Sequence, residues 1–233
     1  MDDDEVAAAY DARAAEYIAL IGSLDQMEHA DIALIERWRD ETPGRLLDAG
    51  CGPGLWTALL GNPNPNQDPA SAPAHHRAAG REVVGADVSG AFLAAARARH
   101  PALRFETASM RDLPFPDGSF GGILAWYSLI HLLPGELPEV FGELARVLAD
   151  GGRILIGYFD GPPGEPFAHA VAPAYYWSSD ALTPLLEDAG FSVTHAERRE
   201  REPGSVGSVR PHGAIIAERG ASALAGDEQL PWT

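Results

Sequence analysis

The sequence lacks a pair of cysteines, a long apolar run and a basic N-terminal segment, which are features of secreted and membrane proteins. Cys51 is the only cysteine among the 233 residues, so no disulfide can form within the chain. No apolar run approaches the roughly 20 residues that span a bilayer. The acidic start, Met-Asp-Asp-Asp-Glu, lacks the basic segment of a secretory signal peptide. We therefore expect a cytoplasmic protein with no membrane partner.

Lysine is missing altogether. All 17 basic residues are arginine, against 34 acidic residues, which gives a net charge of −17. A protein that grips nucleic acid needs a basic stripe to neutralise phosphates. The tightest basic cluster, in residues 197–202, alternates arginine with glutamate and predicts a solvated, self-paired face. These observations predict no nucleic-acid partner, and the alanine- and arginine-rich composition is associated with bacterial genes of high GC content.

The most informative segment is 46–54, Leu-Leu-Asp-Ala-Gly-Cys-Gly-Pro-Gly. Its leucines look like the end of a buried strand, and the apolar pattern that resumes at Leu55 predicts a helix. Between them, Gly50, Gly52 and Gly54 allow a sharp turn and a close approach to a ligand. Strand, glycine turn and helix form the nucleotide-binding half of a doubly wound α/β fold. The alternative is an ordinary tight turn.

A second acid should end the next strand and bind ribose hydroxyls. Asp87, in the run 82–89, supplies it, but it lies 33 residues after Gly54, against a usual offset of about 20. Residues 62–77, rich in Pro, Asn and Ala, account for the excess, because removing these 16 residues leaves 17. We predict that 62–77 is a disordered surface insertion whose two histidines are solvated, and no metal site is expected.

The motif resembles motif I of the class I S-adenosylmethionine-dependent methyltransferases, because Asp48 precedes G-x-G-x-G and Leu55 replaces the third glycine of the dinucleotide fingerprint. The resemblance implies a Rossmann-like α/β fold, with a seven-stranded, mostly parallel sheet, an antiparallel last strand and helices on both faces. It implies S-adenosylmethionine as cofactor and S-adenosylhomocysteine as product. The cofactor-binding residues that it suggests are Tyr10, Asp48, Ala49, Gly50, Gly52, Gly54, Asp87, Val88, Ser109, Met110, Arg111, Ala125 and Trp126.

The resemblance extends along most of the chain, and 45% hydrophobic content suits one domain with a full core. We expect one domain over 1–219, with a helical cover at 1–40 and a flexible tail at 220–233. Further helices are predicted at 90–100, capped by Ser89, at 137–148, stopped by Gly151 and Gly152, and after Ser178, ending at Gly190. Further strands are predicted at 103–105, 121–127, 153–159, 191–199 and 212–219, with a mobile stretch at 161–173.

The reaction centre should lie beyond the carboxyl end of the fourth strand, where open α/β sheets bind ligands. Trp126, Tyr127, Ser128 and His131 follow that strand. Because strand neighbours point to opposite sides, one of the two aromatic residues must pack, and we expect Tyr127 to face the pocket. His131 is the candidate general base, since imidazole titrates near neutral pH. The alternative is a histidine bonded to backbone, and His169 and His212 are weaker candidates.

An N-terminal helix is predicted over 6–20. In similar enzymes such a helix closes over the cofactor, and Tyr10-Asp-Ala-Arg-Ala-Ala-Glu-Tyr17 loosely matches a stretch in which a tyrosine reaches the cofactor. Tyr10 is therefore predicted to contact it. A helix that merely packs is the alternative.

These observations predict methyl transfer to an oxygen, nitrogen or carbon atom of a small molecule. An aromatic or polyketide-like acceptor is suggested by Trp126, Tyr127, Tyr175, Tyr176 and Trp177. The alternative is that these rings pack in a lid, which leaves the acceptor open. The alternatives are a methyltransferase of the same fold that acts on a protein or nucleic acid, a cofactor-binding module without turnover, and a nicotinamide dehydrogenase, which the missing third glycine disfavours. A monomer or homodimer is expected.

Overall fold

The computed structural model describes residues 2–61, 81–200 and 210–221, so the predicted insertion at 62–77 and most of the predicted tail at 220–233 lie outside the described residues. The helices are α1 (Asp3–Ile21), α2 (His29–Glu41), α3 (Leu55–Gly61), α4 (Gly90–Arg99), α5 (Leu137–Val147) and α6 (Ser179–Asp188), with short 3-10 turns at Leu24–Gln26 and Pro134–Glu136. The strands are β1 (Leu46–Ala49), β2 (Val83–Asp87), β3 (Arg104–Thr107), β4 (Phe120–Trp126), β5 (Leu148–Phe159), β6 (Pro166–Phe167), β7 (Ala174–Tyr175), β8 (Phe191–Arg199) and β9 (His212–Arg219).

Seven strands form one sheet in the order β3-β2-β1-β4-β5-β9-β8. The pairs among β1 to β5 are parallel, and β9 is antiparallel to both of its neighbours. The predicted fold class is therefore confirmed. The order reverses between β1 and β4, which is the switch point where such sheets bind ligands.

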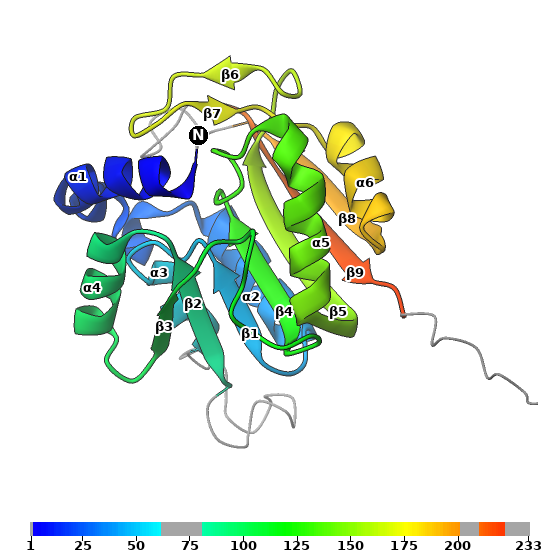
Figure 1. Ribbon diagram of the computed structural model, residues 1–233, viewed down its shortest axis with the longest axis horizontal. Helices are drawn as coiled ribbons and strands as arrows, with labels where there is room; N and C mark the ends of the chain where they lie inside the picture. Colours follow the sequence, from blue (N-terminus) through cyan, green and yellow to red (C-terminus); the bar gives the residue numbers. More distant parts are fainter. Residues whose placement is uncertain (1, 62–80, 201–209, 222–233) are drawn as a thin grey trace, which may run out of the picture.

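Helices cover both faces of the sheet (Figure 1). On one face, buried side chains of α2 and α3, among them Ile35, Trp38 and Leu60, pack against β1, β4 and β5. On the other face, α5 and α6 cover the largest core cluster. In α5, the apolar residues Leu137, Val140, Phe141 and Leu144 recur at helical spacing and are fully buried, as the sequence predicts.

The junction between α5 and β5 differs from the prediction. The helix ends at Val147 rather than at the glycines, and β5 already begins at Leu148, which pairs with Phe120 of β4. The register between the two strands then shifts before Arg153, and Gly151 has a φ of 71°. The glycine pair therefore forms an irregularity inside the strand, because Leu148 gains more from burial at the start of the sheet than from another helical turn.

Two segments cover the carboxyl ends of the parallel strands. Helix α1 and the β6–β7 hairpin lie at the same end of the sheet in Figure 1.

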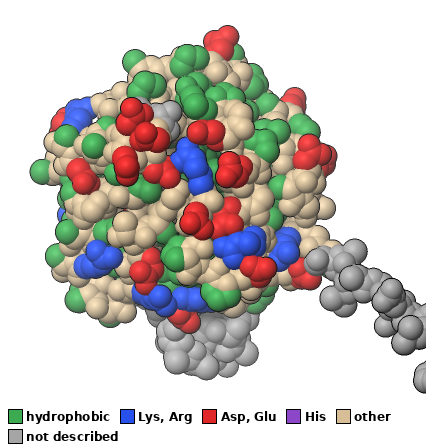
Figure 2. Space-filling model, viewed as in Figure 1, with side chains coloured by type: hydrophobic (Ala, Val, Ile, Leu, Met, Phe, Trp, Pro, Cys, Tyr) green, Lys and Arg blue, Asp and Glu red, His purple; other side chains and the backbone are tan. Residues whose placement is uncertain are grey.

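Among the described residues, none of the helices has the length and apolar character needed to cross a membrane. On the face shown in Figure 2, acidic side chains stand beside the basic ones. Arg198 pairs with Asp160 and Glu200, so the predicted pairing of this arginine cluster extends beyond its own segment.

Candidate functional site

The glycine turn after β1 is held against the end of β2. The backbone N–H groups of Gly50 and Cys51 both donate to the carbonyl of Ala86, at 2.8 and 2.9 Å. Gly50 has a φ of 78°, and a Cβ there would lie 2.2 Å from Cβ of Ser128. Only glycine can therefore occupy this position without displacing the loop after β4.

The two predicted acids lie in different surroundings. Asp87 lines the pocket, and its carboxylate accepts hydrogen bonds from the backbone of Gly52 and Ser89, both at 2.8 Å. Burial raises the pKa of Asp87, although these hydrogen bonds favour the charged form. Asp48 lies behind the turn, 1% exposed, where Thr57 donates to it at 2.6 Å. Burial raises the pKa of Asp48 to about 7.

Helix α1 is fastened across the pocket by polar contacts. The Asp11 carboxylate accepts hydrogen bonds from the Ser89 hydroxyl at 2.6 Å and from the backbone of Ala91 at 3.0 Å, so it caps the N-terminus of α4. Asp3 pairs with Arg111, and Tyr10 contacts the ring of Phe92 on α4. The predicted cover is therefore in contact with the pocket.

His131 is buried and bonded at both ring nitrogens. Its Nδ1 lies 2.8 Å from the carbonyl of Pro173, and its Nε2 lies 2.7 Å from the hydroxyl of Tyr10. A carbonyl can only accept, so we assign the proton to Nδ1 and the lone pair to Nε2, which accepts from Tyr10. Burial lowers the pKa of His131, and its two ring nitrogens face a phenol and a backbone carbonyl rather than a carboxylate. These contacts favour the neutral ring.

Trp126 and Tyr127 both line the pocket, whereas strand alternation predicts only one of them. The reason is that β4 ends at Trp126 and Tyr127 leaves the strand with a φ of 54°, a left-handed conformation that no other described non-glycine residue adopts. Such a conformation costs roughly 1–3 kcal/mol and is typical of functional sites. The phenol hydroxyl of Tyr127 makes a short hydrogen bond with Nδ1 of His212.

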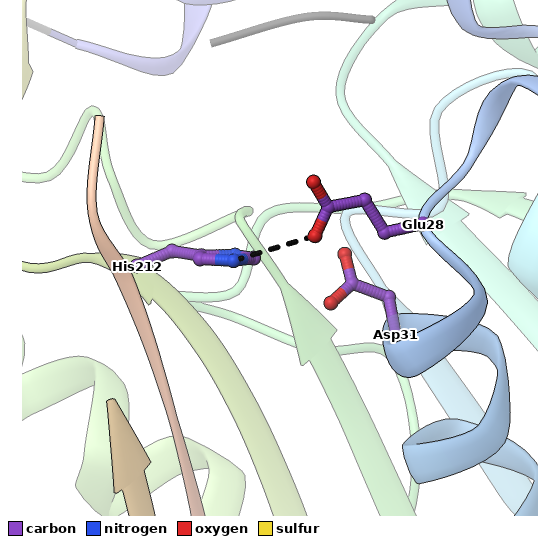
Figure 3. A group of neighbouring side chains, drawn as sticks. All are labelled: Glu28, Asp31 and His212. Atoms are coloured by element: carbon purple, nitrogen blue, oxygen red, sulfur yellow. Dashed lines mark ion pairs between the residues drawn. The ribbon is translucent and has the colours of Figure 1, made fainter. Parts of the chain in front are cut away.

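His212 forms a group behind the pocket with Asp31, which is also buried, and with the half-buried Glu28 (Figure 3). Their ligand-type atoms all lie within 4.8 Å of one another, which is close enough for a metal ion. However, Arg199 donates to Asp31 at 2.6 Å and already brings a positive charge, and Nδ1 of His212 is bonded to Tyr127. We therefore interpret the group as an acid–base cluster.

The pocket gathers residues from α1, the glycine turn and the loops after β2, β3 and β4. Its volume is about 110 Å³. The predicted site residues that line it are Tyr10, Gly50, Gly52, Asp87, Val88, Met110, Arg111, Trp126, Tyr127, Ser128 and His131. The predicted cofactor residues outside the lining are Asp48, Ala49, Gly54, Ser109 and Ala125.

The residues outside the lining have structural contacts instead. A Cβ on Gly54 would lie 3.0 Å from the ring of Phe105, so this glycine allows helix and strand to pack closely. Ala125 is fully buried in the core, and the Ser109 hydroxyl accepts from the backbone of Arg111 at 3.0 Å. Asp48 supports the turn from behind, through Thr57.

Sequence reasoning missed several residues of the wall. Asp3, Val6 and Phe92 line the pocket, and so does Leu132. Phe92 has no signal beyond the apolar face of its helix, and Asp3 stands in an acidic run that looks like a solvated start. Glu28, behind the pocket, also has no local signal, because its neighbour His212 lies far along the chain.

The "Methyltransferase domain" family model matches residues 70–152. A demethylmenaquinone methyltransferase of Clavibacter sepedonicus is 31% identical, over 94% of this chain and 93% of that protein. The chain belongs to the class I S-adenosylmethionine-dependent methyltransferases. The family's cofactor is S-adenosylmethionine.

Other similar proteins support the assignment of the chain to this family. A demethylmenaquinone methyltransferase of Thermus thermophilus is 35% identical over 56% of this chain and 58% of its own. A Burkholderia thailandensis 1,6-didemethyltoxoflavin-N1-methyltransferase, solved with S-adenosylhomocysteine, superimposes with a TM-score of 0.67 over 95% of this chain and 92% of that one, at 20% identity. The chain spans only 37% to 58% of several curated relatives that it matches.

The residues of the pocket suit the family's cofactor. Asp87 brings an acceptor for ribose hydroxyls, and the turn at Gly50 and Gly52 exposes backbone without side chains. The hydroxyl oxygen of Ser128 is buried at the pocket wall and has no hydrogen-bond partner among the described residues. Buried hydroxyls are normally paired, so this one indicates a polar group of a ligand.

Proposed function

We propose that this methyltransferase moves a methyl group from S-adenosylmethionine to a small-molecule acceptor. The observation that supports the proposal best is the convergence of Asp87, the glycine turn and the unpaired Ser128 hydroxyl on one pocket that also contains His131 and Tyr127. The cofactor supplies a methyl group on a positively charged sulfur that leaves with the bonding electrons. The protein's own contribution is then to align the acceptor and manage its proton.

The proposed cofactor subsite consists of the turn and the loop after β2. Gly50 and Gly52 present the backbone, Asp87 accepts hydrogen bonds from ribose, and Met110 lies against the adenine, for which its flexible, polarisable side chain is suited. Asp48, Ala49, Gly54, Ser109 and Ala125 support this subsite without lining it. Tyr10 and Trp126 close it from α1 and β4.

The proposed acceptor subsite lies between α1 and the β6–β7 hairpin, at the carboxyl end of β4. The ring of Tyr127 lies in the pocket wall and packs at a tilt against Phe159, a buried residue that contacts Phe167 of the hairpin. The rings of Trp126 and Tyr127 in the wall favour a flat aromatic acceptor over an extended peptide. The names of two similar proteins give chemically different acceptors, demethylmenaquinone and 1,6-didemethyltoxoflavin. The acceptor of this protein therefore does not follow from the similarity.

His131 and Tyr127 are the proposed catalytic residues. Both line the pocket, and His131 has a lone pair on Nε2 that could accept a hydrogen bond from the acceptor in place of the Tyr10 hydroxyl. The charge of −17 disfavours nucleic acid as the acceptor, and the single cysteine suits a reducing compartment such as the cytoplasm.

The test is calorimetry with S-adenosylhomocysteine, S-adenosylmethionine and NADH. We expect micromolar binding of the two adenosyl compounds and none of NADH; the reverse preference would indicate a dehydrogenase. Turnover is then measured as S-adenosylhomocysteine formation with catechol, 2-naphthol, 1,4-dihydroxynaphthalene and tyramine. Binding without turnover on this panel, with methylation of protein in a lysate, would favour the protein-directed alternative.

Replacing His131 by Ala should lower turnover at least 10-fold, because general acid–base and orienting groups contribute roughly 10²–10⁴-fold. The affinity for S-adenosylhomocysteine should stay within about 2-fold. His195→Ala is the matched control, because His195 is exposed on β8, away from the pocket. Unchanged turnover in His131→Ala would remove His131 from the mechanism.

A further inference from the structure

Three side chains form a line from the pocket wall into the protein. Tyr127 stands in the wall, its hydroxyl bonds to Nδ1 of His212, and Nε2 of His212 lies 3.6 Å from the Glu28 carboxylate (Figure 3). His212 is 1% exposed at the start of β9, and Glu28 precedes α2. Residues from three distant parts of the chain therefore meet at one imidazole.

The partners of His212 determine where its proton lies. Nε2 lies 3.6 Å from the Glu28 carboxylate, beyond hydrogen-bond distance but close enough for the negative charge to favour an N–H there. We therefore assign the hydrogen to Nε2, which leaves the lone pair of Nδ1 to accept from the Tyr127 hydroxyl. With its proton directed at His212, the phenol oxygen has only lone pairs to offer to other groups. This is the tautomer opposite to that of His131.

The charges around the two histidines differ. His212 faces the carboxylate of Glu28 from the segment before α2, the carboxylate of Asp31 on α2, the phenol of Tyr127, and Arg199 on β8, whose guanidinium is bonded to Asp31. Arg199 pairs with both Asp31 and Glu197, and the carboxylate of Glu28 beside Nε2 favours an imidazolium. His131 has a carbonyl and a phenol instead, which favour its neutral form.

We propose that Tyr127, His212 and Glu28 are the proton relay of the proposed methyl transfer, and that His131 only orients the acceptor. The inference rests on the proposed function. The acceptor O–H or N–H gives its proton to the Tyr127 oxygen while the phenol proton moves to Nδ1 of His212. The electron pair left on the acceptor forms its new bond to the methyl carbon, and the imidazolium beside Glu28 later returns its proton through Tyr127 to water. Tyr127 is the catalytic residue, and His212 and Glu28 are positioning residues.

The strained backbone of Tyr127 agrees with this role. A tyrosine that continued β4 would point across the sheet, whereas a φ of 54° turns its hydroxyl to His212 and keeps the ring in the wall. The rest of the structure compensates for this strain, since the ring also packs against Phe159, with centroids 4.9 Å apart.

The test is nitrogen-15 NMR of the histidine side chains in the whole protein, with the signals of His212 assigned by their loss in His212→Asn. We expect the Nε2-protonated ring for His212 and the Nδ1-protonated ring for His131. Glu28→Gln keeps the size of the side chain but removes its charge, and it should lower the pKa of His212 relative to the wild type. Glu36→Gln, on α2 and beside Arg39, is the matched control and should leave that pKa unchanged.

The second part of the test measures activity with whichever of the four acceptors named above the wild-type protein methylates. His212→Asn keeps an amide oxygen near the Nδ1 position but cannot take a proton, so kcat should fall at least 10-fold with KM within about 2-fold. An Nδ1-protonated His212, or equal pKa values in Glu28→Gln and Glu36→Gln, would overturn the relay. If the wild-type protein instead binds no S-adenosylhomocysteine, the proposed function fails, and the relay of methyl transfer fails with it whatever the tautomers.

Discussion

At the scale of single residues, the carboxylates at the ends of β1 and β2 have different roles because the fold places them in different surroundings. Asp87 meets backbone amides at the pocket, whereas Asp48 is enclosed behind the glycine turn with Thr57 as its partner. The first is placed to bind a ligand. The second stabilises the turn in a way that depends on pH, because its surroundings favour the uncharged acid.

Asp87→Asn should weaken S-adenosylhomocysteine binding by at least about 10-fold. Hydrogen bonds to charged groups are worth roughly 1.5–3 kcal/mol, and 1.4 kcal/mol is a factor of ten. Calorimetry at pH 7.5 measures the change. Glu106→Gln is the control, because Glu106 lies on the adjacent strand β3, outside the pocket, and pairs with Arg104. Equal affinities of the two variants would contradict the assignment of Asp87.

Asp48→Asn should reduce the pH dependence of stability between about pH 4 and pH 7. Burial raises the folded-state pKa of Asp48 from its ordinary 3.8 to about 7, so its stabilising contribution is complete below pH 3.8 and is lost as the pH rises through 7. Each pKa unit is worth about 1.4 kcal/mol. Urea unfolding at pH 5 and pH 8 should show a loss in the wild type that exceeds that of the variant by more than ~1 kcal/mol. Parallel profiles would refute a buried, neutral Asp48.

At the scale of elements, α1 controls access to the pocket. It contributes Asp3, Val6, Tyr10 and Tyr17 to the wall, and the cavity beneath it holds only about 110 Å³. Pockets for drug-sized ligands measure roughly 300–1,000 Å³. We therefore expect α1 to move outward when the cofactor enters. Asp11, whose carboxylate lies at the N-terminus of α4, is one of the contacts that would oppose this movement.

Asp11→Ala should accelerate S-adenosylhomocysteine dissociation about 3- to 10-fold, since a carboxylate at a helix N-terminus contributes roughly 0.3–1 kcal/mol and up to about 2 kcal/mol where it is partly buried. Stopped-flow fluorescence of the tryptophans measures the rate. Asp4→Ala is the control, because Asp4 is exposed on the same helix. If both variants release the ligand at the wild-type rate, the anchor does not limit opening.

At the scale of the whole molecule, the cofactor should act as part of the core. It would join α1 to the glycine turn and to the loops after β2 and β4, which belong to separate parts of the sheet. A ligand that binds only the folded state adds stability through mass action. The molecule's resistance to heat is therefore a direct readout of the proposed function.

S-adenosylhomocysteine at 100 times its dissociation constant should raise the melting temperature by roughly 5–10 °C, because this excess adds about 2.7 kcal/mol and a chain of this size gains about 2–4 °C per kcal/mol. Scanning fluorimetry with NADH at the same concentration should show no shift. A shift with NADH alone would contradict the proposed function, and Asp87→Asn should show a smaller shift than the wild type.

Local pattern determined most of the fold. The apolar spacing of residues 137–147, the serine caps at Ser89 and Ser178, and the glycine turn after β1 act over a few residues, so the sequence predicts these elements closely. The mostly parallel, seven-stranded sheet with its antiparallel last strand followed from the family resemblance. The α5–β5 junction was predicted wrongly, because the pairing of Leu148 with Phe120 is a long-range contact that no local pattern contains.

The sequence by itself determined the class of the fold and the place of the pocket, because glycines and acids at the ends of strands act through local backbone geometry. Tertiary structure decided the rest. Only the folded chain turns Tyr127 out of its strand toward His212, 85 positions later, and sets Tyr10 against His131, 121 positions later. Such pairs depend on how distant segments pack, and packing is a property of the whole core rather than of any stretch of sequence.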